Sequence, residues 1–441
     1  MNKLNSGQRK LVYILCALVL LIPIYLLGEP SGAKADSSGG MLAQLRHEHD
    51  LGESDLGEID PTSVTMNLML LGLRGIAVNM LRMDLDHYKD HKEWARMRAT
   101  TEAVITLQPH YIEVWDFLSW NLAYNVSAEW DAVPDRFYWV KEGGKFAQRG
   151  SRRNVASPEL YWYTGRIWGQ KVGRSDEWKL FRGYFLNDPD DDRFGDAADE
   201  EINPDQTDNY LVARDWYARG NTAEQRRVQH IMMRAIFRSY PDRSLLDYAD
   251  ALQREGKFDE FTVQRWEVAL NGWINDYGQD RFRTSSCEVF LEANEDAVKD
   301  LATAQDVPVE EVERSLVFVQ NVVNYRYWRT RARAEAEQET GKAHRKIYAG
   351  EQSYLAGDLD KARDELLEGM NLFADLLQRY PEFEDEDLSI EEGMWAVLLW
   401  QRILQLTGEP IPDNFRLKPL WDKHQGRMSE LEIRFNRLGM E

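Results

Sequence analysis

His87 and His91 form the pair of side chains that comes closest to a metal-binding pattern. A spacing of four places both imidazoles on one face of a helix, and imidazole is a common zinc ligand. Asp84 and Asp90 lie nearby, but the sequence has no HExxH pattern and no evident third ligand. We therefore interpret the two histidines as exposed polar residues of a helix and predict no metal site.

An acidic stretch over residues 190–201 partly matches an EF-hand calcium loop. Its matches to loop positions 1, 3, 6 and 12 are Asp190, Asp192, Gly195 and Glu201. Phe194 and Ala198 occupy positions 5 and 9, where oxygen ligands belong. The stretch is predicted to be a solvated acidic loop, and calcium binding is left open as the alternative.

Aromatic and arginine residues alternate from Tyr325 to Arg333, as they do on some RNA-binding surfaces. However, the chain has 75 acidic against 54 basic residues, a formal net charge of −21. A phosphate backbone needs a basic surface, so nucleic acid is excluded as the main partner. We interpret the stretch as a helix with a buried aromatic stripe.

No catalytic centre is predicted. Cys287 has no histidine beside it in the sequence, and a buried structural cysteine is the expected role. The sequence contains no GxSxG motif, P-loop or dinucleotide fingerprint. We therefore expect a protein that is not an enzyme and that needs no cofactor.

The N-terminus has the pattern of a membrane anchor. Lys3, Arg9 and Lys10 precede an uncharged apolar run over residues 11–28, which is long enough to cross a bilayer. The positive-inside rule then places residues 1–10 in the cytoplasm and the rest of the chain outside. The alternative is a signal peptide cleaved after Ala35. Residues 29–60 are predicted to be a flexible linker.

From residue 61 onwards the apolar residues follow helical spacing, and all-α structure is predicted. A helix is expected to end before Pro109, with Trp115, Leu118, Ser119 and Leu122 on the buried face of the next helix. Leu81, Leu85, Tyr88 and Trp94 precede them in matching register. The spacing resembles the tetratricopeptide repeat (TPR), a helix–turn–helix unit of about 34 residues that stacks into a solenoid.

The same register recurs along the chain. Gly165, Ala213, Ala249 and Gly350 each take the small eighth position of a repeat, where neighbouring helices approach closely. Helix ends are expected at Tyr240–Pro241 and Tyr380–Pro381. A TPR-like domain is thus predicted over residues 61–420, capped by residues 421–441. The alternative is an all-α protein whose glycines and prolines mark ordinary helix ends.

Longer helices are expected between residues 285 and 344. Val312, Leu316, Val319, Val323 and Tyr327 recur at helical spacing through this region. Arg331 with Glu335, and Arg333 with Glu337, are predicted to pair along the exposed side of a helix.

The TPR resemblance also implies a binding groove. In TPR proteins the first helix of each repeat lines a concave surface with its positions 2, 5, 9, 12 and 13. Carried onto this chain, these positions include Asp116, Trp120, Tyr124, Trp162, Arg166 and Glu351. The alternative for Trp120 and Trp162 is that both pack between helices.

The chain is also similar to an uncharacterised bacterial family of membrane-anchored helical proteins, some of which are labelled "iron responsive element". The expected function is a protein–protein interaction scaffold, held by a single span in the inner membrane with its domain on the extracytoplasmic side. The alternatives are a self-assembling structural envelope protein and a helical metal-dependent hydrolase.

Overall fold

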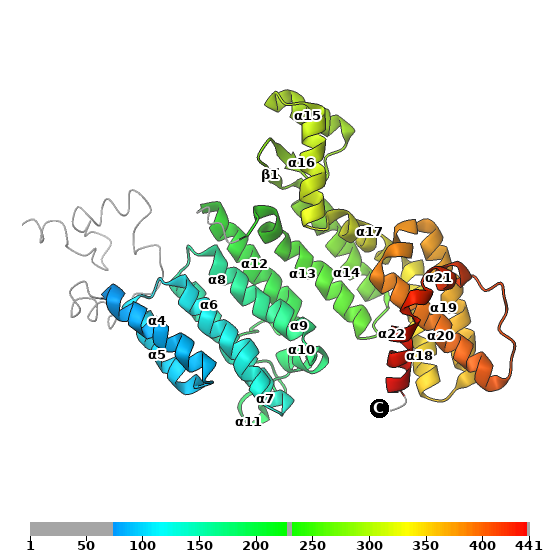
Figure 1. The fold of residues 1–441 in the computed structure, drawn as a ribbon, viewed down its shortest axis with the longest axis horizontal. Helices are drawn as coiled ribbons and strands as arrows, with labels where there is room; N and C mark the ends of the chain where they lie inside the picture. Colours follow the sequence, from blue (N-terminus) through cyan, green and yellow to red (C-terminus); the bar gives the residue numbers. More distant parts are fainter. Residues whose placement is uncertain (1–73, 227–231, 439–441) are drawn as a thin grey trace, which may run out of the picture. The chain divides into compact units, whose positions relative to one another are not determined.

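The computed structural model describes residues 74–226 and 232–438, which are mostly α-helical (Figure 1). The predicted anchor (11–28) and linker (29–60) lie outside the described residues. Among the helices of residues 74–226 and 232–438, none is both long and apolar enough to cross a membrane. The described residues divide into two compact units: unit 1 holds residues 74–164 and 222–226, and unit 2 holds residues 165–221 and 232–438.

Unit 1 is built from consecutive helices joined by short turns. They are α4 (Arg74–Asp90), α5 (Trp94–Leu107), α6 (Ile112–Trp120), α7 (Val133–Arg153) and most of α8 (Pro158–Arg166). A π-helical turn, η2 (Asn121–Val126), and a 3-10 turn, η3 (Ser127–Glu129), extend α6. Neighbouring helices pack together, α4 on α5 and α6 on α7.

The predicted helix boundary at Pro109 is confirmed. Helix α5 ends at Leu107, and the Trp115 indole N–H of the next helix donates a hydrogen bond to the Pro109 carbonyl over 2.8 Å. Trp115, Leu118, Ser119 and Leu122 are all buried, as is Leu85 of α4. The spacing of large apolar residues therefore identified the buried faces of this unit.

Unit 2 contains a longer succession of elements. Its helices are α9 (Val172–Arg174), α10 (Trp178–Leu186), α11 (Asp191–Phe194), α12 (Asn209–Arg226, whose last turn belongs to unit 1), α13 (Arg234–Arg254), α14 (Glu260–Asn271), α15 (Glu295–Gln305), α16 (Val309–Val322), α17 (Tyr325–Glu335), α18 (Gln338–Leu355), α19 (Leu359–Arg379), α20 (Asp387–Thr407), α21 (Lys418–Lys423) and α22 (Met428–Leu438). Two π-helical turns, η4 (Ile167–Lys171) and η5 (Gly272–Asp276), extend α8 and α14, and the 3-10 turns are η6 (Tyr277–Gln279), η7 (Pro381–Asp385) and η8 (Gln425–Arg427).

Small residues allow helices of unit 2 to approach closely, as predicted. A Cβ on Gly165 would lie 2.7 Å from the ring of Tyr217 in α12, and one on Gly350 would lie 2.6 Å from Leu366 in α19. Ala213 and Ala249 are fully buried. These four positions therefore pack against neighbouring helices rather than face solvent.

Two predicted features of unit 2 are wrong. Pro241 lies inside α13 rather than ending a helix, because α13 stays buried on both sides of the proline. The apolar spacing from Val312 to Tyr327 belongs to two helices, since Asn324 takes a left-handed conformation (φ 56°) between α16 and α17. The predicted end at Tyr380–Pro381 is confirmed, because α19 stops at Arg379.

The one departure from all-α structure in the described residues is a short antiparallel hairpin of β1 (Arg281–Arg283) and β2 (Glu288–Phe290). Phe282 pairs with Val289 in it, and both are buried. The strands, α15 and α16 share a hydrophobic core with α14 and α17, in which Cys287 is buried as predicted. Three residues per strand are too few for an alternating pattern to be recognised in the sequence.

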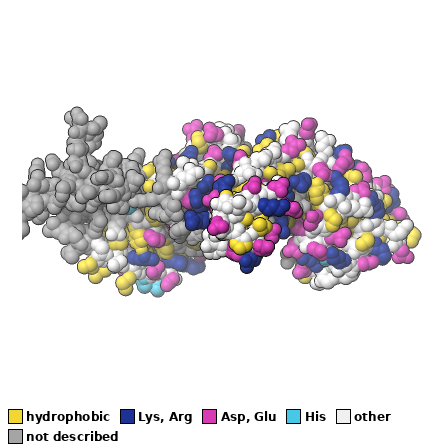
Figure 2. All heavy atoms as spheres, turned by 90° about the horizontal axis from the view of Figure 1, so that it is seen from above, with side chains coloured by type: hydrophobic (Ala, Val, Ile, Leu, Met, Phe, Trp, Pro, Cys, Tyr) yellow, Lys and Arg dark blue, Asp and Glu magenta, His cyan; other side chains and the backbone are white. Residues whose placement is uncertain are grey.

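The C-terminal part packs on the last long helix. Leu431 of α22 is buried in the core formed by α18, α19 and α20, and Trp421, Met428 and Phe435 pack against the same core. The predicted boundary between residues 420 and 421 falls inside α21. On the face seen in Figure 2, acidic and basic side chains are interspersed over the described part of the chain.

Candidate functional site

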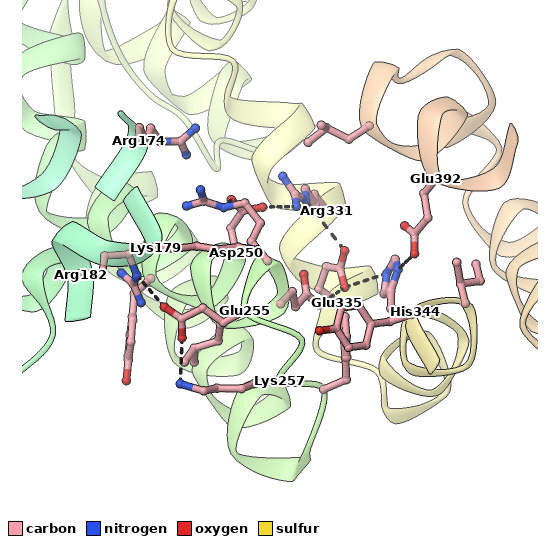
Figure 3. Close-up of a pocket in the computed structure, with 18 of the residues that line it drawn as sticks. Arg174, Lys179, Arg182, Asp250, Glu255, Lys257, Arg331, Glu335, His344 and Glu392 are labelled. Carbon is pink, nitrogen blue, oxygen red and sulfur yellow. Dashed lines mark hydrogen bonds and ion pairs between the residues drawn. The ribbon is translucent and has the colours of Figure 1, made fainter. Parts of the chain in front are cut away.

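A cleft of about 1460 Å³ in unit 2 is the main candidate for a binding site (Figure 3). Its walls come from helices far apart in the sequence, chiefly α10, α13, α18 and α20, with contributions from the α13–α14 turn and from α17. Small-molecule pockets usually enclose about 300–1,000 Å³. The cleft therefore exceeds the usual size of a site for a single small ligand.

The residues of α13 and α18 that face the cleft follow two small, closely packed residues. Asp250 and Glu351 directly follow Ala249, which is buried in a hydrophobic cluster, and Gly350, which packs closely on Leu366 of α19. Four residues later, Arg254 and Leu355 lie on the same faces, and all four line the cleft. Both helices thus line the cleft with the residues that lie one and five places after their small residue.

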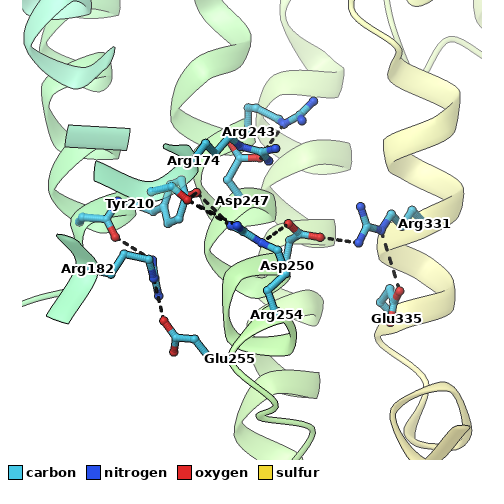
Figure 4. A network of polar contacts seen from close by, with 12 residues as sticks. Arg174, Arg182, Tyr210, Arg243, Asp247, Asp250, Arg254, Glu255, Arg331 and Glu335 are labelled. Carbon is cyan, nitrogen blue, oxygen red and sulfur yellow. Dashed lines mark hydrogen bonds and ion pairs between the residues drawn. The ribbon is translucent and has the colours of Figure 1, made fainter. Parts of the chain in front are cut away.

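A continuous chain of charged groups crosses the floor of the cleft (Figures 3 and 4). Asp250 of α13 lies 2.5 Å from Arg331 of α17, and Arg331 lies 3.9 Å from Glu335. His344 of α18 lies between two carboxylates, with Nε2 3.2 Å from Glu335 and Nδ1 2.7 Å from Glu392 of α20. The chain thereby connects four helices.

The pKa values of this chain follow from burial and mutual charge. Burial alone would lower the pKa of His344, but Glu392 and Glu335 raise it well above its ordinary value of 6.5. Burial would raise the pKa of Glu335, yet His344 and Arg331 lower it. The pKa of Asp250 is lowered in the same way, against burial, by Arg331, Arg254 and Arg174. The groups are therefore charged together at neutral pH.

Arg331 and Glu335 do form an ion pair, but the prediction that this pair lies on the exposed side of a helix is wrong. Glu335 is buried in the floor of the cleft and the Arg331 side chain is only 12 % exposed. The helical spacing was correct, but α17 packs against α14, pairs with α13 through Arg331 and Asp250, and connects to α18. Burial of this pair depends on partners about 80 residues away, which local spacing does not reveal.

A second group of charges lies at the α10 end of the cleft. Arg182 is buried between Asp208, at 2.9 Å, and Glu255, at 2.7 Å. Glu255 also accepts a hydrogen bond from Lys257 over 2.8 Å. Arg174 pairs with Asp247 at 2.5 Å (Figure 4).

Exposed apolar side chains surround these charges. Leu186 of α10, Phe261 of α14, Leu355 of α18 and Leu388 of α20 all line the cleft and are exposed. Large apolar side chains that stay exposed around a concavity mark binding surfaces more often than isolated ones do. The cleft therefore combines an apolar rim with a polar floor.

The predicted groove residues are distributed over both units. Glu351 lines the cleft, where its carboxylate accepts a hydrogen bond from the Trp395 indole over 3.0 Å. In unit 1, Trp120 is exposed (36 %) and its ring stacks on Tyr124 with 3.7 Å between centroids, while Asp116 is half-buried. Arg166 of unit 2 is half-buried and does not line this cleft.

Trp162 does not lie on an open surface as predicted, because only 7 % of it is exposed. The alternative, that this tryptophan packs between helices, agrees with its burial. Trp120, by contrast, has the exposure expected of a groove residue.

The weaker candidates remain unsupported. The rings of His87 and His91 lie 4.2 Å apart, but Nδ1 of His91 contacts the carbonyl of His87. In the acidic loop, Asp190 precedes the single helical turn α11. Within residues 74–226 and 232–438, no group of three or more His, Cys, Asp or Glu side chains could hold a metal ion. In α17, Tyr325 and Trp328 are buried, in agreement with a buried aromatic stripe.

Asp250, Gln253 and Arg254 are cleft residues that sequence reasoning missed. The signal was present, because they occupy positions 9, 12 and 13 counted from Ala249 at position 8. The cationic residues of α9 and α10 had no comparable signal, since they follow a π-helical turn outside the predicted repeat register.

Comparison with known proteins found no matching family model, no matching curated protein and no matching solved structure.

Proposed function

We propose that this protein is a TPR-like interaction scaffold that binds a segment of another protein in the cleft of unit 2. The observation that carries the proposal is the composition of the cleft: exposed apolar side chains form its rim, and charged groups engaged with one another form its floor. A polypeptide offers apolar side chains and polar backbone groups together, which matches such a surface. No catalysis is assigned to the protein.

The fixed floor favours binding over chemistry. Asp250, Glu335 and Glu392 each contact a cation, so their carboxylates are held in place before any ligand arrives. Prearranged side chains reduce the entropy that binding must overcome. A groove of this kind is what the TPR resemblance implies, and Glu351 belongs to it.

We also propose that the chain is anchored in a membrane by its N-terminal segment. The basic residues Lys3, Arg9 and Lys10 before the apolar run 11–28 support an anchor in the inner membrane, with the helical units on the extracytoplasmic side. The partner segment would then belong to an extracytoplasmic protein or to a neighbouring membrane protein.

Site-specific photo-crosslinking in intact membranes tests the proposal. A benzophenone amino acid replaces Leu355 in the cleft, and a matched variant carries it at Leu367, an exposed leucine of α19 outside the cleft. We expect a discrete cross-linked product from position 355 and none from position 367. Equal cross-linking from both positions, or none from position 355, would contradict binding in the cleft. A product of twice the chain's own mass would instead indicate self-assembly.

A further inference from the structure

The proposed function does not specify which residue types the bound segment contains. The charged residues at the α9–α10 end of the cleft indicate which types would bind there. Arg174, Lys179, Arg182, Arg254 and Lys257 line this end, together with Asp208, Asp250 and Glu255. A count of charges gives only a small cationic excess. What a ligand meets, however, depends on which of these groups reach solvent.

Three cations at this end of the cleft are more exposed than the carboxylates they pair with, whereas Arg182 is buried between Asp208 and Glu255. In the pair Arg174–Asp247 the side chains are 37 % and 4 % exposed, and in Arg254–Asp250 they are 30 % and 10 % exposed. Lys257 is 58 % exposed against 22 % for Glu255. In each of these three pairs the carboxylate offsets part of the charge, but the cation is the more exposed partner.

Lys179 adds a positive charge that forms no ion pair with a carboxylate of the described residues. It is exposed on α10, and within the described residues no acidic side chain pairs with it. Its ammonium lies 5.7 Å from the centre of the Trp178 ring, and the Arg254 guanidinium lies 4.6 Å from the same ring. Contacts between a cation and an aromatic face hold the cation without neutralising it.

We infer that the segment bound in this cleft is acidic and that its carboxylates face the wall formed by Arg174, Lys179, Arg254 and Lys257. The inference rests on the proposed function and names the partner's chemistry. It is specific because the whole chain carries a formal charge of −21 and would otherwise repel an acidic peptide. The apolar side chains of the segment would meet Leu186 and Phe261, which are exposed beside this wall.

Two short biotinylated peptides test the inference on full-length protein in membranes. One alternates Glu and Leu, and its twin replaces every Glu by Gln. Each is irradiated with membranes that carry the photo-reactive amino acid at Leu355, and biotin transferred to the chain is measured. We expect the Glu peptide to label the chain several-fold more strongly than its twin, and less as ionic strength rises.

Reversing the charge of two lysines in the cleft tests the inference, and reversing one lysine outside the cleft is the control. Lys179→Glu with Lys257→Glu should reduce labelling by the Glu peptide by about tenfold, because two attractive contacts become repulsive. Labelling by the Gln peptide should not change. Lys299→Glu makes the same kind of change at an exposed lysine of α15 outside the cleft and should have no effect.

The failures of the two proposals can be told apart. Equal labelling by both peptides, labelling by neither, or no effect of the double reversal would overturn the acidic segment while the partner cross-link at Leu355 remains. Absence of that partner cross-link in the unaltered chain would overturn the proposed function itself.

Discussion

At the scale of single residues, glycines decide how closely the helices of unit 2 pack. Gly165 faces the ring of Tyr217, which is itself buried and cannot move away freely. Gly183 in α10 has no atom within 4 Å of the position where a Cβ would lie. The two glycines both lie inside helices but differ in the space around them.

Alanine at these two positions should therefore have opposite effects. We expect Gly165→Ala to destabilise the protein by about 1–3 kcal/mol through overpacking against Tyr217. Gly183→Ala should be neutral or stabilising by up to about 1 kcal/mol, because alanine suits a helix interior better than glycine. Chemical denaturation of both variants measures the difference. A lower midpoint for Gly183→Ala than for Gly165→Ala would contradict the packing described.

At the scale of elements, the connection between α18 and α19 depends on one backbone conformation. Gly357 has φ 79°, and its N–H donates to the Tyr354 carbonyl at the end of α18. Asp358 then caps α19 by accepting a hydrogen bond from the Lys361 N–H. The turn brings α18, which carries Glu351 and Leu355, against α19.

Gly357→Ala tests this turn without a steric clash, because no atom lies within 4 Å of its missing Cβ. We expect a loss of about 1–2 kcal/mol from forcing an L-residue into the left-handed region. Gly426→Ala, also in open space but not at positive φ, should cost much less. Thermal unfolding of both variants is the measurement, and equal melting temperatures would show that the turn conformation is unimportant.

At the scale of the whole molecule, the charged chain from Asp250 to Glu392 joins α13, α17, α18 and α20. His344 holds the last two links, and its pKa is raised in the folded state. A raised pKa means that the folded protein binds the proton more tightly than the unfolded chain does, so protonation stabilises the fold.

The pH dependence of stability follows with a definite sign. The contribution of His344 should be complete below the unfolded pKa of about 6.5 and should be lost as pH rises through the folded value. We expect the free energy of unfolding to fall from neutral to alkaline pH. His344→Gln should lower it at neutral pH and flatten this decline.

His110→Gln is a suitable control, because His110 contacts the neutral side chain of Asn154. This control should leave the alkaline decline intact. Denaturation midpoints measured from pH 6 to 9 would contradict the argument if the His344→Gln variant followed the same curve as the unaltered protein.

Sequence spacing predicted the local structure better than the site. The buried set around Trp115, the close approach at Gly165 and the end at Tyr380–Pro381 depend on residues near one another in the chain, so their spacing reveals them. Pro241 misled the prediction because tertiary packing on both sides outweighs one missing hydrogen bond.

The candidate site was predicted only in part. Glu351 was identified from the repeat register, and Asp250 and Arg254 follow from the same rule applied to α13. The pairing of Arg331 with Asp250 joins residues 81 positions apart, and no periodicity encodes such a contact. The exposure of Trp120 and the burial of Trp162 likewise depend on surroundings that the sequence does not specify.

The π-helical turns have a consequence for how the proposed TPR-like repeats of this chain should be aligned. Helices α6, α8 and α14 each continue into such a turn: η2, η4 and η5. A π turn closes its hydrogen bonds over five residues instead of four and so takes up one extra residue. Residues beyond it are displaced by one place relative to a repeat of fixed length. An alignment that permits a one-residue gap at Asn121, Ile167 and Gly272 should therefore recover internal similarity that a strict 34-residue period obscures.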